Sequence, residues 1–170
     1  MALLRGLAAL GILLVALVLQ VAVFGYFSVE GVVPDLVLLV VVAAALSRGP
    51  QFAAVLGFTG GLLLDLAPPA DHVAGRWALA LVVVGYLAGR VRQDARDSTF
   101  AALVTVAACS FVGTSIFALT GLVLHDGALP ATGMLRVVGI SVLWDVLVAP
   151  LALPGLLLLF RRLRPPQLVY

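Results

Sequence analysis

Apolar residues fill most of the chain in long uninterrupted runs, and polar residues gather in the short stretches between them. A helix needs about 20 residues to cross the roughly 30 Å hydrocarbon core of a bilayer. The first run and the last two are long enough, while the middle three are short. We therefore predict one all-α, polytopic membrane domain over residues 1–170, with six transmembrane helices at about 7–27, 34–47, 50–67, 77–90, 99–124 and 135–160.

Proline, glycine and aspartate mark the ends of the short runs. Pro34 and Asp35 fit a helix start, because proline suits the first turn and an acid suits the positive end of the helix dipole. Arg48–Pro50 breaks the next run and starts another, which Pro68–Pro69 ends. Residues 36–66 then form either two short helices, which we favour, or a re-entrant hairpin.

The distribution of arginine predicts how the chain is threaded. All ten basic residues are arginine. If the amino terminus is inside, eight of them lie in the inner segments and only Arg76 and Arg136 lie outside. Basic residues concentrate on the cytoplasmic side of membrane proteins. We predict a multi-pass plasma-membrane protein with six crossings and both termini in the cytoplasm.

Composition excludes a soluble domain, since 64% of the residues are hydrophobic and 11% are charged. The sequence pI near 9.2 could suggest nucleic acid. The arginines adjoin apolar runs, however, so we predict contact with membrane lipid and none with nucleic acid. The single cysteine, Cys109, cannot form an intrachain disulfide. We interpret the first apolar run as a retained helix and not as a removed signal peptide.

Two aspartates lie in the apolar segments. Asp145 is in the middle of the last one, where a carboxylate costs roughly 2.5–3.5 kcal/mol on insertion scales and must face protein or water. We favour a buried hydrogen bond to a hydroxyl of the fifth helix over partner contact or ion coupling. The hydroxyls considered for Asp145 are those of Thr105, Ser110, Thr114 and Ser115. The other aspartate, Asp65, ends the third run near the outer interface, where we expect it to pair with Arg76 or to cap a neighbouring helix.

Glycine and proline predict how the helices pack. Gly57 with Gly61, and Gly85 with Gly89, are small-xxx-small pairs that let helix backbones approach closely. We favour packing within the chain over contact with another protein or a chance pattern. Two prolines in the last predicted helix, Pro150 and Pro154, each remove a backbone hydrogen bond and kink it. The kink wraps this helix around the bundle or, as a weaker alternative, acts as a hinge.

Catalytic and metal chemistry have little support. The only histidines, His72 and His125, lie in predicted outer loops, which leaves an intramembrane serine nucleophile without a base. The threading places Asp65 and Asp145 at different depths, which disfavours an aspartyl pair. A metal site built from the two histidines and the acids beside them is a minor alternative. We predict no enzyme activity, no cofactor and no metal.

Several motifs follow one another in order along the chain. They are Pro34–Leu38, Ser47–Pro50, Gly57–Leu66, Pro68–His72, Gly75–Leu79, Val84–Gly89 and Trp144–Pro150. Pro-Asp-Leu, the glycine-rich helix and Leu-Leu-Leu-Asp-Leu are unusual together. This series, which covers nearly the whole chain, resembles the rod shape-determining protein MreD family, of the high-GC Gram-positive type.

This resemblance implies a non-enzymatic scaffold of the cell-elongation machinery that supports peptidoglycan synthesis and rod shape. Its implied partner is the bitopic MreC and, indirectly, a RodA-type glycosyltransferase, a class B penicillin-binding protein and the actin-like MreB. The implied fold resembles the substrate-binding component of energy-coupling-factor transporters. The family has no established catalytic residues, so the candidates are structural or partner-contact residues: Asp65, Asp145, Gly57, Gly61, Gly85, Gly89 and Arg76.

A small-molecule carrier component is the competing function. The same six-helix architecture serves vitamin-type substrate binding, which requires a cavity lined by several polar groups. Asp65, Arg76, Trp77 and Thr59 could contribute to one near the outer face. The surrounding segment is otherwise aliphatic, and we favour the scaffold.

Overall fold

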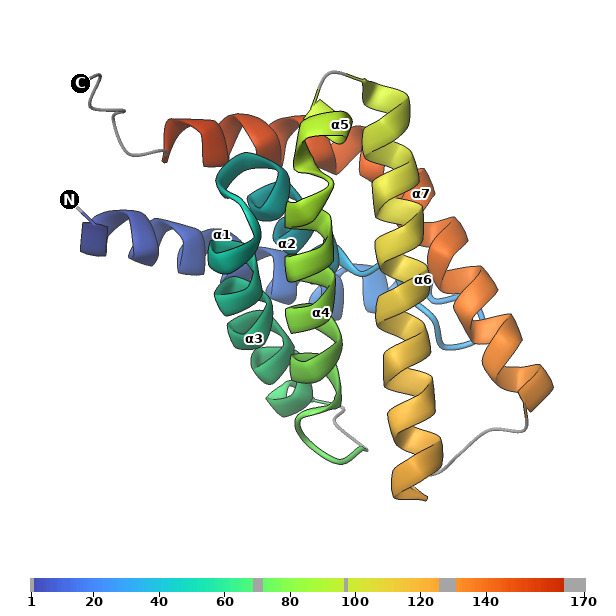
Figure 1. Ribbon diagram of the computed structural model, residues 1–170. Coiled ribbons are helices and arrows are strands. Elements are labelled where there is room, and N and C mark those ends of the chain that lie inside the picture. The colour runs from blue at the N-terminus through green and yellow to red at the C-terminus, as the bar shows by residue number, and fades with distance from the viewer. Residues whose placement is uncertain (1, 69–71, 97, 126–130, 164–170) are drawn as a thin grey trace, which may run out of the picture.

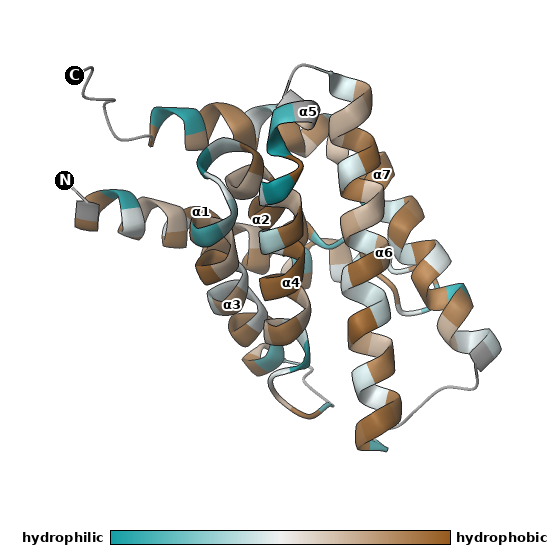
Figure 2. Ribbon diagram, in the orientation of Figure 1, coloured by the Kyte–Doolittle hydropathy of each residue, from teal (hydrophilic) through white to brown (hydrophobic). Residues whose placement is uncertain are grey.

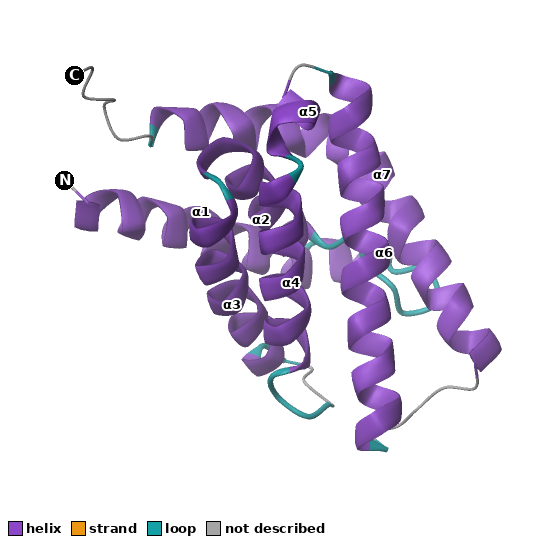
Figure 3. Cartoon of the chain, viewed as in Figure 1, coloured by secondary structure: helices purple, strands orange, loops and turns teal. Residues whose placement is uncertain are grey.

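The structure is a computed structural model that describes residues 2–68, 72–96, 98–125 and 131–163. These residues form helices and connecting turns, without a named strand (Figure 1, Figure 3), and the all-α prediction is confirmed. The elements in order are α1 (Ala2–Ala22), the 3-10 helix η1 (Phe24–Phe27), α2 (Leu36–Arg48), α3 (Pro50–Leu66), α4 (Arg76–Arg90), α5 (Arg92–Arg96), α6 (Thr99–Leu124) and α7 (Ala131–Arg162).

The ends of the first and last helices differ from the prediction. α1 lies at Ala2–Ala22 and not at 7–27. The apolar run continues to Phe27, but the chain leaves the α-helix after Ala22 and forms a 3-10 turn at Phe24–Phe27. α7 is longer than 135–160 at both ends, and its last turn carries two arginines that favour the negative end of the helix dipole. The short helix α5 has no apolar run and was not predicted.

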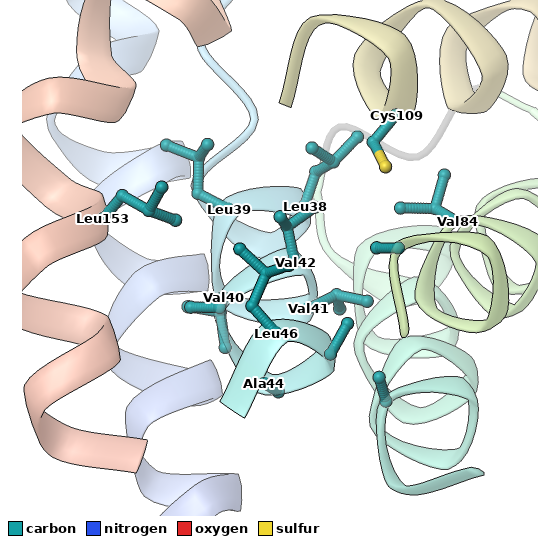
Figure 4. Packing of buried hydrophobic residues seen from close by; sticks show 14 of the residues in the cluster. Leu38, Leu39, Val40, Val41, Val42, Ala44, Leu46, Val84, Cys109 and Leu153 are labelled. Carbon is teal, nitrogen blue, oxygen red and sulfur yellow. The ribbon is translucent and has the colours of Figure 1, made fainter. Parts of the chain in front are cut away.

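Helix α2 is the centre of the bundle. Every residue from Leu36 to Ser47 is buried, and α2 contacts α1, α3, α4, α5, α6 and α7. Figure 4 shows its side chains pointing outwards in several directions, with Leu39 towards Leu153 of α7 and Leu38 towards Cys109 of α6. A helix of 13 residues covers only about 20 Å. Because protein surrounds α2, its short length exposes none of its backbone ends to lipid tails.

A single residue joins α2 to α3. Gly49 has a φ of +99°, a backbone conformation that is strained for residues with a side chain. It is the C-cap of α2 and the N-cap of α3. Pro50 occupies the first position of α3, where its missing N–H costs no hydrogen bond. The two helices therefore reverse direction without a loop.

Helix α7 bends across the bundle. Pro150 and Pro154 lie inside it, and Figure 1 shows its first part beside α6 and its last part turned back towards the side where α1 begins. The buried ring of Phe160, near the end of α7, packs edge-on against Phe52 of α3 with ring centroids 6.4 Å apart. The bend thus brings the end of α7 onto the bundle.

The outer faces of the long helices are apolar. Figure 2 shows brown, hydrophobic residues along them, with teal residues mainly near helix ends and in loops. Within the described ranges, three helices are long and apolar enough to cross a membrane, namely Leu3–Ala22, Thr99–Leu124 and Thr132–Arg162. Large exposed side chains such as Val15, Phe111 and Leu151 cover their outward surfaces. This combination indicates a membrane location.

Candidate functional site: two carboxylates at helix starts

Asp145 of α7 binds the amino-terminal end of the central helix. Its Oδ1 accepts the backbone N–H of Asp35, the N-cap residue of α2, at 2.6 Å. Its Oδ2 accepts the hydroxyl of Ser110 on α6, also at 2.6 Å. Asp145 is 0% exposed. Ser110 is one of the four hydroxyls considered from the sequence, whereas the contact with α2 was not foreseen.

Two further side chains complete the cap of α2. Asp35 Oδ1 accepts the N–H of Leu38 at 2.9 Å, and Gln20 Oε1 from α1 accepts the N–H of Val37 at 3.1 Å. The first N–H groups of a helix have no partner within the helix and must bind elsewhere when buried. Side chains of α1 and α7 and of the N-cap residue itself supply those partners here. The helix predicted at 34–47 included Asp35, which instead precedes the first turn of α2 as its N-cap.

A line of hydroxyls continues the polar cluster between α6 and α7. Thr114 and Ser141 are buried, and their hydroxyl oxygens lie 3.1 Å apart. The Thr114 hydroxyl also lies 2.8 Å from the carbonyl oxygen of Ser110, one turn earlier on α6. Hydrogen bonds between helices favour a single register in an apolar interior. Gln20 and Ser141 were not singled out from sequence, although Gln20 is the only amide in the first apolar run and could have been noticed.

Asp65 caps the amino-terminal end of α4. Its carboxylate accepts the N–H groups of Gly75, Trp77 and Ala78 at 2.8, 3.0 and 3.1 Å. The Nε2 atom of His72 lies 3.0 Å from Asp65 Oδ1. Asp65 is 2% exposed, so the end of α3 holds the start of α4 through a buried carboxylate. A negative charge at this position also favours the positive end of the helix dipole.

Arg76 packs against α6 through one aromatic residue. Its guanidinium lies 3.9 Å from the ring centroid of Phe117 and donates to the Phe117 carbonyl oxygen at 2.7 Å. Trp77 stacks on the same ring with centroids 4.5 Å apart. A cation over an aromatic face is attracted to it more strongly where water is excluded. Gly121, one turn further along α6, leaves room for the guanidinium.

The four candidate glycines line the contact between α3 and α4. A Cβ at Gly57 would overlap the backbone of Leu81, and one at Gly61 would overlap the backbone of Trp77 and Ala78. From the other helix, a Cβ at Gly85 would lie 2.5 Å from the carbonyl oxygen of Ala53, and Gly89 faces Pro50 as closely. The two backbones therefore approach closely at these four glycines, over about three turns of each helix. The Asp65 cap lies at one end of this contact.

The contacts of the polar side chains bear on the carrier cavity and the metal site that were considered from sequence. Thr59 donates to the carbonyl oxygen of Val55 within its own helix at 3.0 Å. Together with Asp65, Arg76 and Trp77, it belongs to the set considered for a carrier cavity, and these four side chains make contacts within the protein. Of the metal site considered from sequence, the acids beside the two histidines lie outside the described residues. Among the described residues, no group of three metal-ligating side chains occurs.

The family model for the rod shape-determining protein MreD matches residues 2–162, nearly the whole chain. The chain belongs to the MreD family. The predicted family is confirmed, while its high-GC Gram-positive type stays a prediction, and the family's role in rod shape determination applies to this protein. No curated protein and no solved structure shows significant similarity to the chain. For this MreD-family chain, the capping aspartates and the glycine contact are the features that the structure adds.

Proposed function

We propose that this MreD-family protein is a non-enzymatic, multi-pass scaffold of the cell-elongation machinery. It binds an MreC-like bitopic protein and, through it, supports a RodA-type glycosyltransferase, a class B penicillin-binding protein and MreB in peptidoglycan synthesis. The observation that carries the proposal is the family match over residues 2–162. The use of Asp65 and Asp145 as structural caps supports it, because their hydrogen bonds hold the fold together.

An apolar groove supports binding of a membrane-spanning partner helix. It lies between α1, α2 and α7, has a volume of about 530 Å³ and includes Gly11 and Gly155 in its lining. A Cβ at either glycine would meet no atom within 4 Å, so both backbones are open to the groove. Small residues let a second helix approach closely, where dispersion and weak hydrogen bonds drive association in lipid.

Co-purification tests the proposal. The detergent-solubilised, tagged chain is expected to capture the MreC-like protein of the same cell, and depletion is expected to cause loss of rod shape. Gly155→Leu is expected to reduce capture, whereas Gly139→Leu is the matched control, since Gly139 is an equally open glycine of α7 outside the groove lining. No capture of any elongation component, with normal cell shape on depletion, would end the proposal. A vitamin that stabilises the purified chain in a thermal-shift screen would favour the carrier instead.

A further inference from the structure

Asp35 and Asp145 place two carboxyl groups in one buried cluster. Asp35 is 4% exposed and Asp145 is 0% exposed. Asp145 uses both of its oxygens, one for the Asp35 N–H and one for Ser110. Asp35 uses only Oδ1, for Leu38, and its Oδ2 is buried with no hydrogen-bond partner. A buried polar atom without a partner is costly and calls for an explanation.

The charges of the cluster do not balance if both carboxyls are ionised. Neither forms an ion pair within the described part of the chain. The side chains that bond within the cluster, Gln20 of α1 and Ser110 of α6, are neutral. The carboxyl of Asp35 repels a negative charge on Asp145. On α3, Asp65 bonds instead to His72 and to the start of α4.

The start of α2 can compensate one negative charge but not two. A helix dipole is equivalent to roughly half a positive charge at the amino terminus. The N–H groups of Asp35 and Leu38 add hydrogen bonds to carboxylate oxygens. Two carboxylates that share a site cannot both ionise cheaply, and one then retains its proton. Burial among apolar helices strengthens this repulsion.

We propose that the Asp35–Asp145 pair is a proton-binding site that holds one proton in the folded protein. The proton comes from water and forms an O–H bond at Asp35 Oδ2, the oxygen without a partner. It turns that oxygen from an acceptor without a donor into a hydroxyl donor. The pair then carries one negative charge, which the start of α2 compensates. The proton joins α2 to α1, α6 and α7, and its loss weakens the centre of the bundle.

The pH dependence of unfolding of the full chain in detergent tests this site. If the folded state holds a proton that the unfolded state releases, stability falls as pH rises, and the unfolding constant grows by up to about tenfold per pH unit. Asp35→Asn supplies an amide donor in place of the acid, keeps a good N-cap residue and is expected to remove this dependence. Glu30→Gln, an exposed carboxyl paired with Arg136, is the control that retains it. An unchanged pH dependence in Asp35→Asn overturns the proposal.

Infrared spectroscopy gives an independent readout. The C=O stretch of a protonated carboxylic acid is resolved from that of a carboxylate. We expect such a band at neutral pH in the wild type, and its loss in both Asp35→Asn and Asp145→Asn. The second variant keeps the test decisive if the first fails to fold. Absence of the band overturns the proposal, as does stabilisation by sodium that disappears in Asp35→Asn, since a metal ion would then balance the charge.

Discussion

The backbone N–H of Asp35 donates to the carboxylate of Asp145 at 2.6 Å, across 110 residues of sequence. This bond fixes the last long helix to the start of the central one. α2 is apolar and surrounded by protein, so its first N–H groups have no water to bind. An isolated carboxylate in the last helix would be expensive, as would an uncapped end of α2. The Asp145 carboxylate and the end of α2 satisfy each other's hydrogen bonding, which explains an acid at this depth.

Replacing Asp145 by leucine is expected to destabilise the fold. The N–H of Asp35 and the hydroxyl of Ser110 would both lose their acceptor, and a buried unsatisfied donor costs about 1–3 kcal/mol. The free energy of unfolding in mixed micelles measures the change. Asp145→Asn keeps an acceptor for the N–H and should lose clearly less. Equal losses in the two variants would contradict the capping role.

Asp65→Ala is expected to destabilise the start of α4, because one carboxylate serves three backbone N–H groups and His72. Loss of the cap and of the interaction with the helix dipole should lower stability by about 2–4 kcal/mol. His72→Ala removes the side-chain contact and leaves the described backbone N–H contacts of Asp65, so it serves as the matched comparison. Hydrogen exchange of the first turn of α4 should rise in Asp65→Ala. A stability loss no greater than that of His72→Ala would be evidence against the cap.

Bulk at the α3–α4 contact is expected to separate the two helices. A Cβ at Gly57 or Gly61 overlaps backbone atoms, which cannot rotate away, and overpacking costs typically 1–3 kcal/mol or more. Gly57→Ala and Gly61→Ala should therefore reduce the amount of folded protein. Gly11→Ala and Gly139→Ala face open space and should be neutral or slightly stabilising. Thermal unfolding of the four purified variants decides the question.

Hydropathy predicts the helices of this chain well because each apolar run is also a helix. The start at Pro50 and the span of α6 follow directly from sequence. The end of α1 does not, because hydrophobicity is the same in an α-helix and in the 3-10 turn at Phe24–Phe27. A hydrophobicity pattern indicates which residues prefer lipid, but it does not indicate where the backbone hydrogen bonding of a helix ends.

The polar contacts could be predicted only in part. Membrane depth indicates that Asp145 needs a partner, and residue type indicates that a hydroxyl such as Ser110 can supply one. The actual arrangement depends on which helix ends meet inside the bundle. Asp35 and Gln20 become part of the site only because α2 is central, and no local spacing records that position. A contact between residues 110 positions apart, such as Asp35 with Asp145, can be recognised only once the fold is known.

Orientation remains a prediction of the arginine distribution, and reporter fusions to the full chain test it. Basic residues resist transfer to the outer side, and the inner segments hold eight of ten arginines in the predicted threading. The exposed pair of Glu30 with Arg136, at 2.8 Å, joins two segments that this threading places outside. Reporters fused at either terminus should be active in the cytoplasm, and one inserted after Leu124 should be active outside. Because six crossings return the chain to its starting side, termini on opposite sides would require an odd number and would refute the threading.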